Sequence, residues 1–221
     1  MAAWNCRAGQ RLGAGDAIAG LVDYKDAEAL LSRYGIRTSP SKYVGSAEEA
    51  VEFSAGEPIA LKVITPRAPH KSRLGLVALG LTGRDITKAF GLVAKRAARY
   101  RPYRMLAQRM SKPGIEIILG GNTDPQFGKM VLIGLGGIYV EAFRDFALRV
   151  CPISDYDAES MIDQLRSGRI VAHSDRQRAM LSGLIVSVSH MFVESALTEL
   201  DLNPVILHDD SYDVVDVRLF G

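Results

Sequence analysis

Cysteine is scarce in this sequence. Among its 221 residues only Cys6 and Cys151 carry a thiol, and their positions form no metal-ligand spacing. Two cysteines cannot provide the several disulfides that hold small secreted domains together. Their number argues against a disulfide-rich extracellular protein and favours a reducing, cytoplasmic setting.

Long apolar runs are also missing. No stretch of about 18 consecutive apolar residues occurs, the length that a membrane-spanning helix needs. The longest candidate, residues 181–193, contains three serines and His190, which is more typical of a buried helix. Arg7, Arg11 and Asp16 interrupt the N-terminal segment, unlike the apolar core of a signal peptide. We therefore expect a soluble protein with no membrane partner.

Charge of one sign does not dominate. The chain has 27 Lys and Arg residues against 25 Asp and Glu, a formal net charge of +2. This balance argues against a nucleic-acid partner held by the field of the whole protein. Hydrophobic residues make up 48% and charged residues 24%, which is ordinary for a globular domain and excludes a disordered chain. A charged ligand must therefore be held by a local site.

Helical periodicity and short apolar runs alternate along the chain. The pattern predicts helices over residues 23–34, 46–56, 84–100, 155–167 and 175–196, and strands over 58–64, 76–81, 104–110, 115–120, 130–135, 201–207 and 213–219. Because Lys112-Pro-Gly is typical of a turn, strands 104–110 and 115–120 are expected to form a hairpin, which excludes a strictly parallel sheet. The pattern predicts an α/β (α+β) fold with two lobes joined near residues 103–109.

Three oxygen-bearing side chains gather near the C-terminal end. Asp201 and Asn203 are two positions apart on a predicted strand and so point to one face, and Asp216 is expected on the next strand. Two carboxylates and an amide oxygen suit a Mg²⁺ ion that keeps waters and shares phosphate oxygens. The alternative is that Asn203-Pro204 is a turn and the aspartates are solvated.

Lys62 and Glu116 stand between apolar neighbours on predicted strands. An amine on an interior strand needs a counter-charge, which a nucleotide phosphate supplies; a lysine that snorkels from an edge strand is the alternative. A buried carboxylate at 116 would accept hydrogen bonds from a ligand such as a ribose; a simple exposed strand position is the alternative.

Two further features remain ambiguous by pattern alone. Gly136-Gly137 follows an apolar strand, where free N–H groups can cradle phosphate; a tight structural turn is the alternative, and the pattern alone favours it. His70 stands in a loop with Arg67, Lys71 and Arg73. An imidazole there suits a phosphoryl acceptor or general base, and the cations would stabilise a transferring phosphoryl group. A loop histidine with no role is the alternative.

Taken in order, five segments resemble the beta subunit of ADP-forming acetyl-CoA synthetases, relatives of succinyl-CoA synthetase with an ATP-grasp fold. The resemblance covers residues 24–221. The segments are Ala60-Leu-Lys-Val with Pro69-His-Lys-Ser, Gly120-Gly-Asn-Thr-Asp-Pro-Gln-Phe-Gly, Gly134-Leu-Gly-Gly-Ile-Tyr-Val-Glu, Asp201-Leu-Asn-Pro and Val215-Asp-Val-Arg.

The resemblance implies a role for each matching residue. The family carries a phosphoryl group to ADP on a loop histidine, which His70 matches, and Glu141 with the glycine pair matches the region that meets that group. The implied sites are catalytic His70 and Glu141, nucleotide-binding Lys62, Gln108, Arg109, Met110 and Glu116, phosphate-binding Gly136 and Gly137, and Mg²⁺ ligands Asp201, Asn203 and Asp216.

The family reaction is acyl-CoA + ADP + phosphate ⇌ carboxylic acid + CoA + ATP. It implies ATP/ADP and Mg²⁺ as cofactors and an acid–CoA ligase that needs a CoA-binding alpha subunit, in an alpha2beta2-type hetero-oligomer. The expected division is an N-terminal arm over residues 1–20, a smaller ATP-grasp lobe over 21–107 and a larger lobe with the nucleotide and magnesium site over 108–221.

Three positions depart from the family pattern. Arg73 replaces an acid and Leu76 a glycine after His70, and Arg109 replaces a glutamate beside the expected nucleotide pocket. These changes leave open an alternative function, a catalytically silent ATP-grasp module that senses nucleotide. A free-standing carboxylate–amine ligase would need a further substrate domain, for which 221 residues leave no room.

Overall fold

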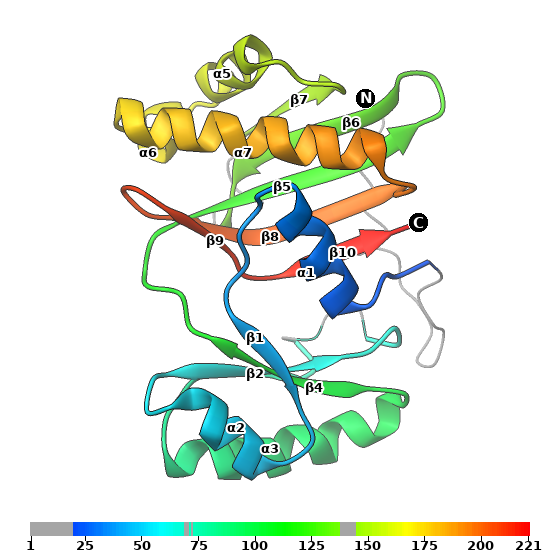
Figure 1. Cartoon of the computed structure of the whole chain (residues 1–221), viewed down its shortest axis with the longest axis vertical. Coiled ribbons are helices and arrows are strands. Elements are labelled where there is room, and N and C mark those ends of the chain that lie inside the picture. Colours follow the sequence, from blue (N-terminus) through cyan, green and yellow to red (C-terminus); the bar gives the residue numbers. More distant parts are fainter. Residues whose placement is uncertain (1–19, 69–70, 72, 138–144) are drawn as a thin grey trace. The chain divides into compact units, whose positions relative to one another are not determined.

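The computed structural model describes residues 20–68, 71, 73–137 and 145–221. Within this part of the chain, two compact units form, each with its own sheet (Figure 1). Ser39–Met110 makes the smaller unit, and Gly20–Thr38 joins Ser111–Gly221 in the larger one. The assignment of Gly20–Thr38 differs from the expected lobe ranges because Leu21 bridges Phe220 and Thr38 bridges Val214.

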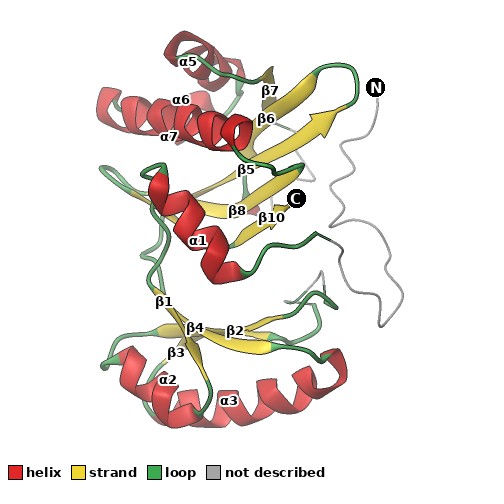
Figure 2. Ribbon diagram, turned by 45° about the vertical axis from the view of Figure 1, so that its right-hand side comes forward, coloured by secondary structure: helices red, strands yellow, loops and turns green. Residues whose placement is uncertain are grey.

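The smaller unit is a four-stranded antiparallel sheet with two helices on one face (Figure 2). The strand order is β1-β4-β2-β3, so β4 and β2 are interior. Its elements are β1 (Ser41–Val44), α2 (Ala47–Ser54), β2 (Ile59–Ile64), β3 (Val77–Leu81), α3 (Arg84–Ala97), the 3-10 turn η2 (Ala98–Tyr100) and β4 (Arg104–Arg109).

Local sequence explains how these elements begin and where their core lies. The Ser46 side chain accepts a hydrogen bond from the Glu49 backbone N–H and so caps α2, at the start of the helix predicted over residues 46–56. Ile59, Leu61 and Val63 alternate along β2 and form the core with Ile86 and Val93 of α3. The positions between them therefore face the other side of the sheet.

The larger unit is a six-stranded antiparallel sheet with order β10-β8-β5-β6-β7, and β9 pairs with β8. Helix α7 packs on β6, α5 on β7 and α1 on β10. The elements are α1 (Tyr24–Arg33), β5 (Ile115–Asp124), β6 (Gly128–Leu135), β7 (Phe146–Val150), α5 (Asp155–Gln164), α6 (Gly168–Val171), α7 (Asp175–Glu194), β8 (Glu199–Leu207), β9 (Tyr212–Val214) and β10 (Val217–Phe220).

The predicted two-lobed α/β architecture is confirmed, but the predicted hairpin is wrong. β4 pairs with β1 and β2, whereas β5 pairs with β6 and β8. Both edges of each strand are thus occupied, and the turn at residues 111–114 links the two units. The structure also adds β1 and β7, which the pattern did not predict.

No helix within the described ranges combines the length and the hydropathy needed to cross a membrane.

Candidate functional site

Lys62 lies in the middle of β2, an interior strand of the smaller unit. Only 5% of its surface is exposed. Its register partners are Leu106 on β4 and Val77 on β3. Since Leu61 and Val63 face the helices, Lys62 faces the opposite side of the sheet. The prediction of an amine on an interior strand is confirmed.

Gln108 shares that face with Lys62. It lies opposite Ala60, two positions from the partner of Lys62, so the two side chains are diagonal neighbours on β2 and β4. Gln108 is fully buried. The structure therefore brings together an ammonium group and an amide, which can hold a phosphate and a polar base or sugar group.

The Arg109 side chain points the other way. Its guanidinium lies 5.3 Å from the Phe53 ring centroid and donates to the Ser54 carbonyl at the end of α2. Cations favour this position because the last carbonyls of a helix carry partial negative charge. Arg109, which stands where the family has a glutamate, therefore binds the C-terminal end of α2, on the face away from Lys62 and Gln108.

The backbone at 109 and 110 is also engaged within the smaller unit. The Arg109 N–H donates to the Pro40 carbonyl at 2.9 Å, and the Met110 N–H donates to Pro58 at 3.2 Å. A nucleotide base that accepts from these N–H groups would have to share or displace both bonds. The Met110 side chain is 40% exposed.

Glu116 and the glycine pair lie against each other in the larger unit. The Gly136 N–H donates to the Glu116 carbonyl at 2.7 Å. A Cβ at 136 would stand 2.9 Å from that oxygen, and one at 137 would stand 3.1 Å from Glu116 Oε2. Gly137 also has φ +71°, which disfavours other residues. The Gly136 N–H thus supports the structural turn, and the Glu116 side chain is exposed.

The three residues predicted as oxygen ligands lie near an irregularity in β8. Between the pairs Ile117–Val205 and Leu119–Leu202, β8 holds one residue more than β5, and Asn203 lies in this bulge. The Asn203 N–H donates to the Asp216 carbonyl at 3.2 Å. The strand predicted over residues 213–219 is divided into β9 and β10, and Asp216 lies between them, beside Asn203.

Asp201 lies in a field of mixed charge. The pKa of its carboxyl is raised to about 6: burial, the largest cause, raises it, nearby Arg218 lowers it, and Asp216 and Glu199 raise it. Arg218 is the register partner of Asp201 on β10, and its Nε lies 3.9 Å from Asp216 Oδ2. Glu199, two positions before Asp201 on β8, is 7% exposed.

Sequence reasoning did not single out Arg218 or Glu199. The period of two would have placed Glu199 on the face of Asp201, but only the strand register reveals Arg218. Within the described ranges, no group of three His, Cys, Asp or Glu residues is arranged to hold a metal. The predicted magnesium ligands are not a group of that kind, because one of their three oxygens belongs to the amide of Asn203.

His70 and Glu141 lie outside the described residues. Leu76, which follows His70 in the sequence, is fully buried in the core of the smaller unit. The Leu76 N–H donates to Lys71 and its carbonyl accepts from Val63, each at 2.9 Å. The replacement of a glycine by Leu76 thus fills the core, and Arg73 is exposed.

Residues 16–220 match the model of the ATP-grasp domain. The beta subunit of acetate–CoA ligase [ADP-forming] I from Pyrococcus furiosus is 34% identical over 206 residues, which cover 88% of this chain and 89% of that subunit. Acetate–CoA ligase [ADP-forming] I from Archaeoglobus fulgidus is also 34% identical, over 201 residues, but the match spans only 29% of its length.

Solved structures agree with this assignment. Acetyl-coenzyme A synthetase 1 of Ca. Korarchaeum cryptofilum, in complex with coenzyme A and Ca-AMPCP, superimposes with a TM-score of 0.81 at 35% identity, covering 89% of this chain and 91% of that chain. A second complex of that protein contains coenzyme A and Mg-AMPPCP, with a phosphohistidine segment pointing towards the nucleotide site; its TM-score is 0.77 at 33% identity, covering 91% and 92%.

Proposed function

The chain belongs to the ATP-grasp family and, within it, to the beta subunits of ADP-forming acetyl-CoA synthetases, and from this membership we propose that it transfers a phosphoryl group between a phosphohistidine and ADP or ATP. The proposed overall reaction converts acyl-CoA, ADP and phosphate to a carboxylic acid, CoA and ATP. The observation that carries the proposal is the match to almost the whole of a separate beta subunit.

Lys62 and Gln108 support the nucleotide part of this proposal. Their shared face offers a buried ammonium group to phosphate oxygens. An ion pair with a phosphate is stronger there than in water because the surroundings are poorly polarisable. We assign phosphate binding to Lys62 and a base or sugar contact to Gln108. Glu116 is exposed rather than buried, and its ribose contact is proposed from the family resemblance alone.

The donor set of Asp201, Asn203 and Asp216 fits Mg²⁺. All three side chains offer hard oxygen atoms, and their small number leaves positions for water and phosphate. Mg²⁺, when bound, neutralises charge on the phosphate oxygens during transfer. Burial is the largest cause of the raised pKa of Asp201 and outweighs the effect of Arg218; a divalent cation there would favour the ionised carboxylate.

His70 is proposed as the group that carries the phosphoryl. In the direction from ATP, an imidazole nitrogen attacks the γ-phosphorus, a P–N bond forms, and the P–O bond to ADP breaks with its electron pair leaving on ADP. In the opposite direction, ADP takes the phosphoryl group from the ring. Glu141 and the Gly136-Gly137 turn are proposed to meet the same group.

The proposed partner is a CoA-binding alpha subunit in an alpha2beta2-type assembly in the cytoplasm. What supports it is that relatives exist both as separate beta subunits and as longer chains, of which this chain spans 29%. The names of the relatives include acetate, 4-hydroxybutyrate and trans-feruloyl ligases or synthases, so the acyl group is proposed to be selected by the partner.

The test is a labelling experiment with γ-labelled ATP and Mg²⁺ on the purified chain, alone and with a candidate alpha subunit. We expect acid-labile, base-stable label in the wild type and none in His70→Ala. His173→Ala is the matched control, because its side chain is 48% exposed and has no proposed role. Tight nucleotide binding with no label and no turnover under either condition would instead indicate the silent sensing module.

A further inference from the structure

Arg218 is a cation on the strand beside the proposed magnesium ligands. It stands opposite Asp201 in the register of β8 and β10, and its Nε lies 3.9 Å from Asp216 Oδ2. The side chains of Arg218 and Asp216 are 18% and 20% exposed, so water screens their charges only in part. One guanidinium therefore faces two of the carboxylates to which Mg²⁺ is assigned.

These charged groups lie on the face of the larger sheet that points away from α7. A Cβ at Gly121 on β5 would stand 2.8 Å from the Leu200 side chain and 3.1 Å from the Phe192 ring of α7, so Leu200 faces that helix. Alternate residues of a strand point to opposite faces. Asp201 and its register partner Arg218 therefore share the face without α7.

Arg218 lowers the negative charge that this face offers to a metal ion. Two carboxylates, Asp216 and Glu199, and one cation, Arg218, act on the Asp201 carboxyl. Together with Asp201 these groups sum to −2 when all are ionised, and without Arg218 they would sum to −3. A divalent cation is attracted by the carboxylates, whereas the guanidinium repels it and competes for the same oxygen atoms.

We propose that Arg218 opposes the binding of a free divalent cation to Asp201 and Asp216, so that Mg²⁺ is held there only together with the phosphate oxygens of a nucleotide. This inference rests on the proposed function, which supplies the nucleotide and the metal ligands. Phosphate oxygens bring the negative charge that the guanidinium offsets, and they are ligands that Mg²⁺ prefers. The cation consequently enters and leaves the site with the nucleotide.

Titration of the full chain with Mn²⁺ in the absence of nucleotide tests the proposal, with electron paramagnetic resonance of the free ion as the readout. At pH 7.5, Arg218→Met binds Mn²⁺ at least about tenfold more tightly than the wild type, because a like charge beside the ion is removed. Arg218→Lys keeps the charge and stays within about threefold of the wild type. An arginine that merely supported the ligands would give the opposite sign, a loss of about 10–100-fold in Arg218→Met.

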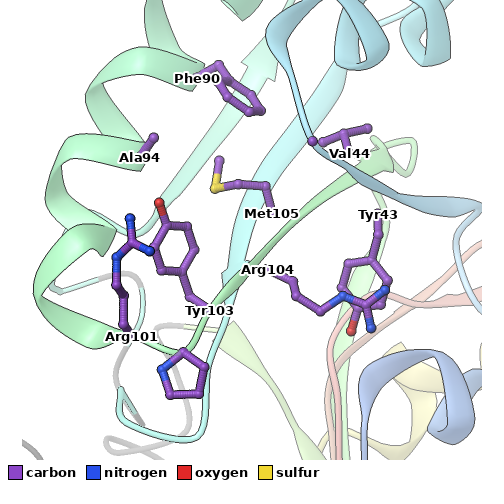
Figure 3. Close-up of a pocket in the computed structure, with 10 residues that line it drawn as sticks. Tyr43, Val44, Phe90, Ala94, Arg101, Tyr103, Arg104 and Met105 are labelled. Atoms are coloured by element: carbon purple, nitrogen blue, oxygen red, sulfur yellow. The ribbon is translucent and has the colours of Figure 1, made fainter.

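Two other arginines provide matched controls. Arg178 pairs with Asp163 at 2.7 Å, between α7 and α5, and Arg101 lies 5.7 Å from the Tyr103 ring, beside which Figure 3 shows it. Neither contacts a proposed metal ligand among the described residues. Arg178→Met and Arg101→Met each remove one positive charge, and Mn²⁺ affinity stays within about twofold of the wild type. A gain equal to that of Arg218→Met in either control would overturn the proposal.

A double variant tests where the ion binds. Adding Asp216→Asn to Arg218→Met removes the charge of one proposed ligand, and the gain in Mn²⁺ affinity is lost. Circular dichroism and the unfolding midpoint confirm that the variants fold; if Arg218→Met does not, Arg218→Gln, which keeps N–H donors without the charge, takes its place with the same expected gain. Unchanged or weaker Mn²⁺ binding in the uncharged variant, or a gain that survives Asp216→Asn, would overturn the proposal. Because this titration contains no nucleotide, its outcome is independent of the labelling test, and the two proposals can fail separately.

Discussion

Asp201 and Arg218 stand directly opposite each other on the neighbouring strands β8 and β10. Arg218 also reaches Asp216, with Nε 3.9 Å from Oδ2, so one guanidinium faces two carboxylates. A single cation does not outweigh the burial of Asp201, because the pKa of that carboxyl is still raised to about 6. Burial is the largest cause of that shift, and a divalent cation at the proposed site would favour the ionised carboxylate.

The raised pKa makes a prediction about stability and pH. The native state holds the Asp201 proton up to about pH 6, whereas the unfolded chain releases it near pH 4. Between these values the native state binds more protons, so the free energy of unfolding falls as pH rises. The penalty is absent below about pH 4 and complete above about pH 6, where it amounts to roughly 3 kcal/mol.

Asp201→Asn is therefore expected to be more stable than the wild type at pH 7.5 and to lose most of that advantage at pH 4.5. Urea unfolding in the presence of a chelator measures both. Asp209→Asn is the control, because the Asp209 side chain is 95% exposed and its substitution should shift stability little at either pH. An Asp201→Asn protein less stable than the wild type at pH 7.5 would contradict the assignment.

Lys62→Met separates a binding role from a structural one. Methionine has a similar volume and no charge to bury, so the variant is expected to fold with little loss of stability, about 1 kcal/mol or less. Its affinity for ATP is expected to fall about tenfold or more, because a charge-assisted bond to phosphate is lost. Equilibrium binding and thermal unfolding measure the two effects. Lys42→Met on the edge strand, where the side chain is exposed, should change neither.

Gly137→Ala tests the contact between the glycine pair and Glu116, and Gly128→Ala is its matched control. Gly128→Ala meets a positive φ of +75° with open space, whereas Gly137→Ala meets φ +71° and Glu116 Oε2 at 3.1 Å. Both should lose about 1 kcal/mol of stability from the backbone. Only Gly137→Ala should also displace the Glu116 carboxylate and weaken nucleotide binding. Equal nucleotide affinities in the two variants would show that the contact with Glu116 has no binding role.

Local patterns predicted the helices and the long strands because their signals are contained in a few residues. Ser46 caps α2 and the apolar alternation of β2 marks its buried face, and both are readable from sequence. The pairing of β4 with β5 was predicted wrongly because a turn signature indicates that the chain bends, not which sheet each strand joins. β1 and β7 were missed because each is short, lies at a sheet edge and buries one residue.

The candidate site divides in the same way. The position of Lys62 follows from strand periodicity, which the sequence supports. Asn203 lies in a bulge and Asp216 lies between two strands, and periodicity predicts neither. The orientation of Arg109 depends on Phe53 and the end of α2, more than 50 positions away, and the place of Arg218 opposite Asp201 depends on the register of two strands. Such long-range contacts leave no periodic signal in one sequence.

Lys129 is predicted to stabilise the C-terminal end of α7. Its ammonium donates to the carbonyls of Phe192 and Ser195 at 2.5 and 2.6 Å, and burial lowers its pKa. Lys129→Met leaves these carbonyls without that donor, with an expected loss of about 1–3 kcal/mol in urea unfolding. Lys88→Met, at a side chain that is 76% exposed, should cost less than about 0.5 kcal/mol.

The first residue after the smaller unit, Ser111, is tied to the β8–β9 hairpin. Its Oγ donates to Asp213 Oδ2 at 2.6 Å and lies 3.2 Å from His208 Nε2, which is 3.3 Å from the same carboxylate oxygen. The three residue types are those of a hydrolytic triad, but a triad uses both ring nitrogens of histidine. Here serine and aspartate share Nε2, so the cluster is expected to be structural and to confer no esterase activity.

A double-mutant cycle with Ser111→Ala and Asp213→Asn measures this tie. The two residues are 102 positions apart in sequence but in direct contact, so their effects on the free energy of unfolding should couple by about 0.5–3 kcal/mol. Ser111→Ala together with His208→Ala should cost more than Ser111→Ala alone, because the contact between His208 and Asp213 is lost as well. Strictly additive effects would mean that the serine is not held by this cluster, and that the link between the units is anchored elsewhere.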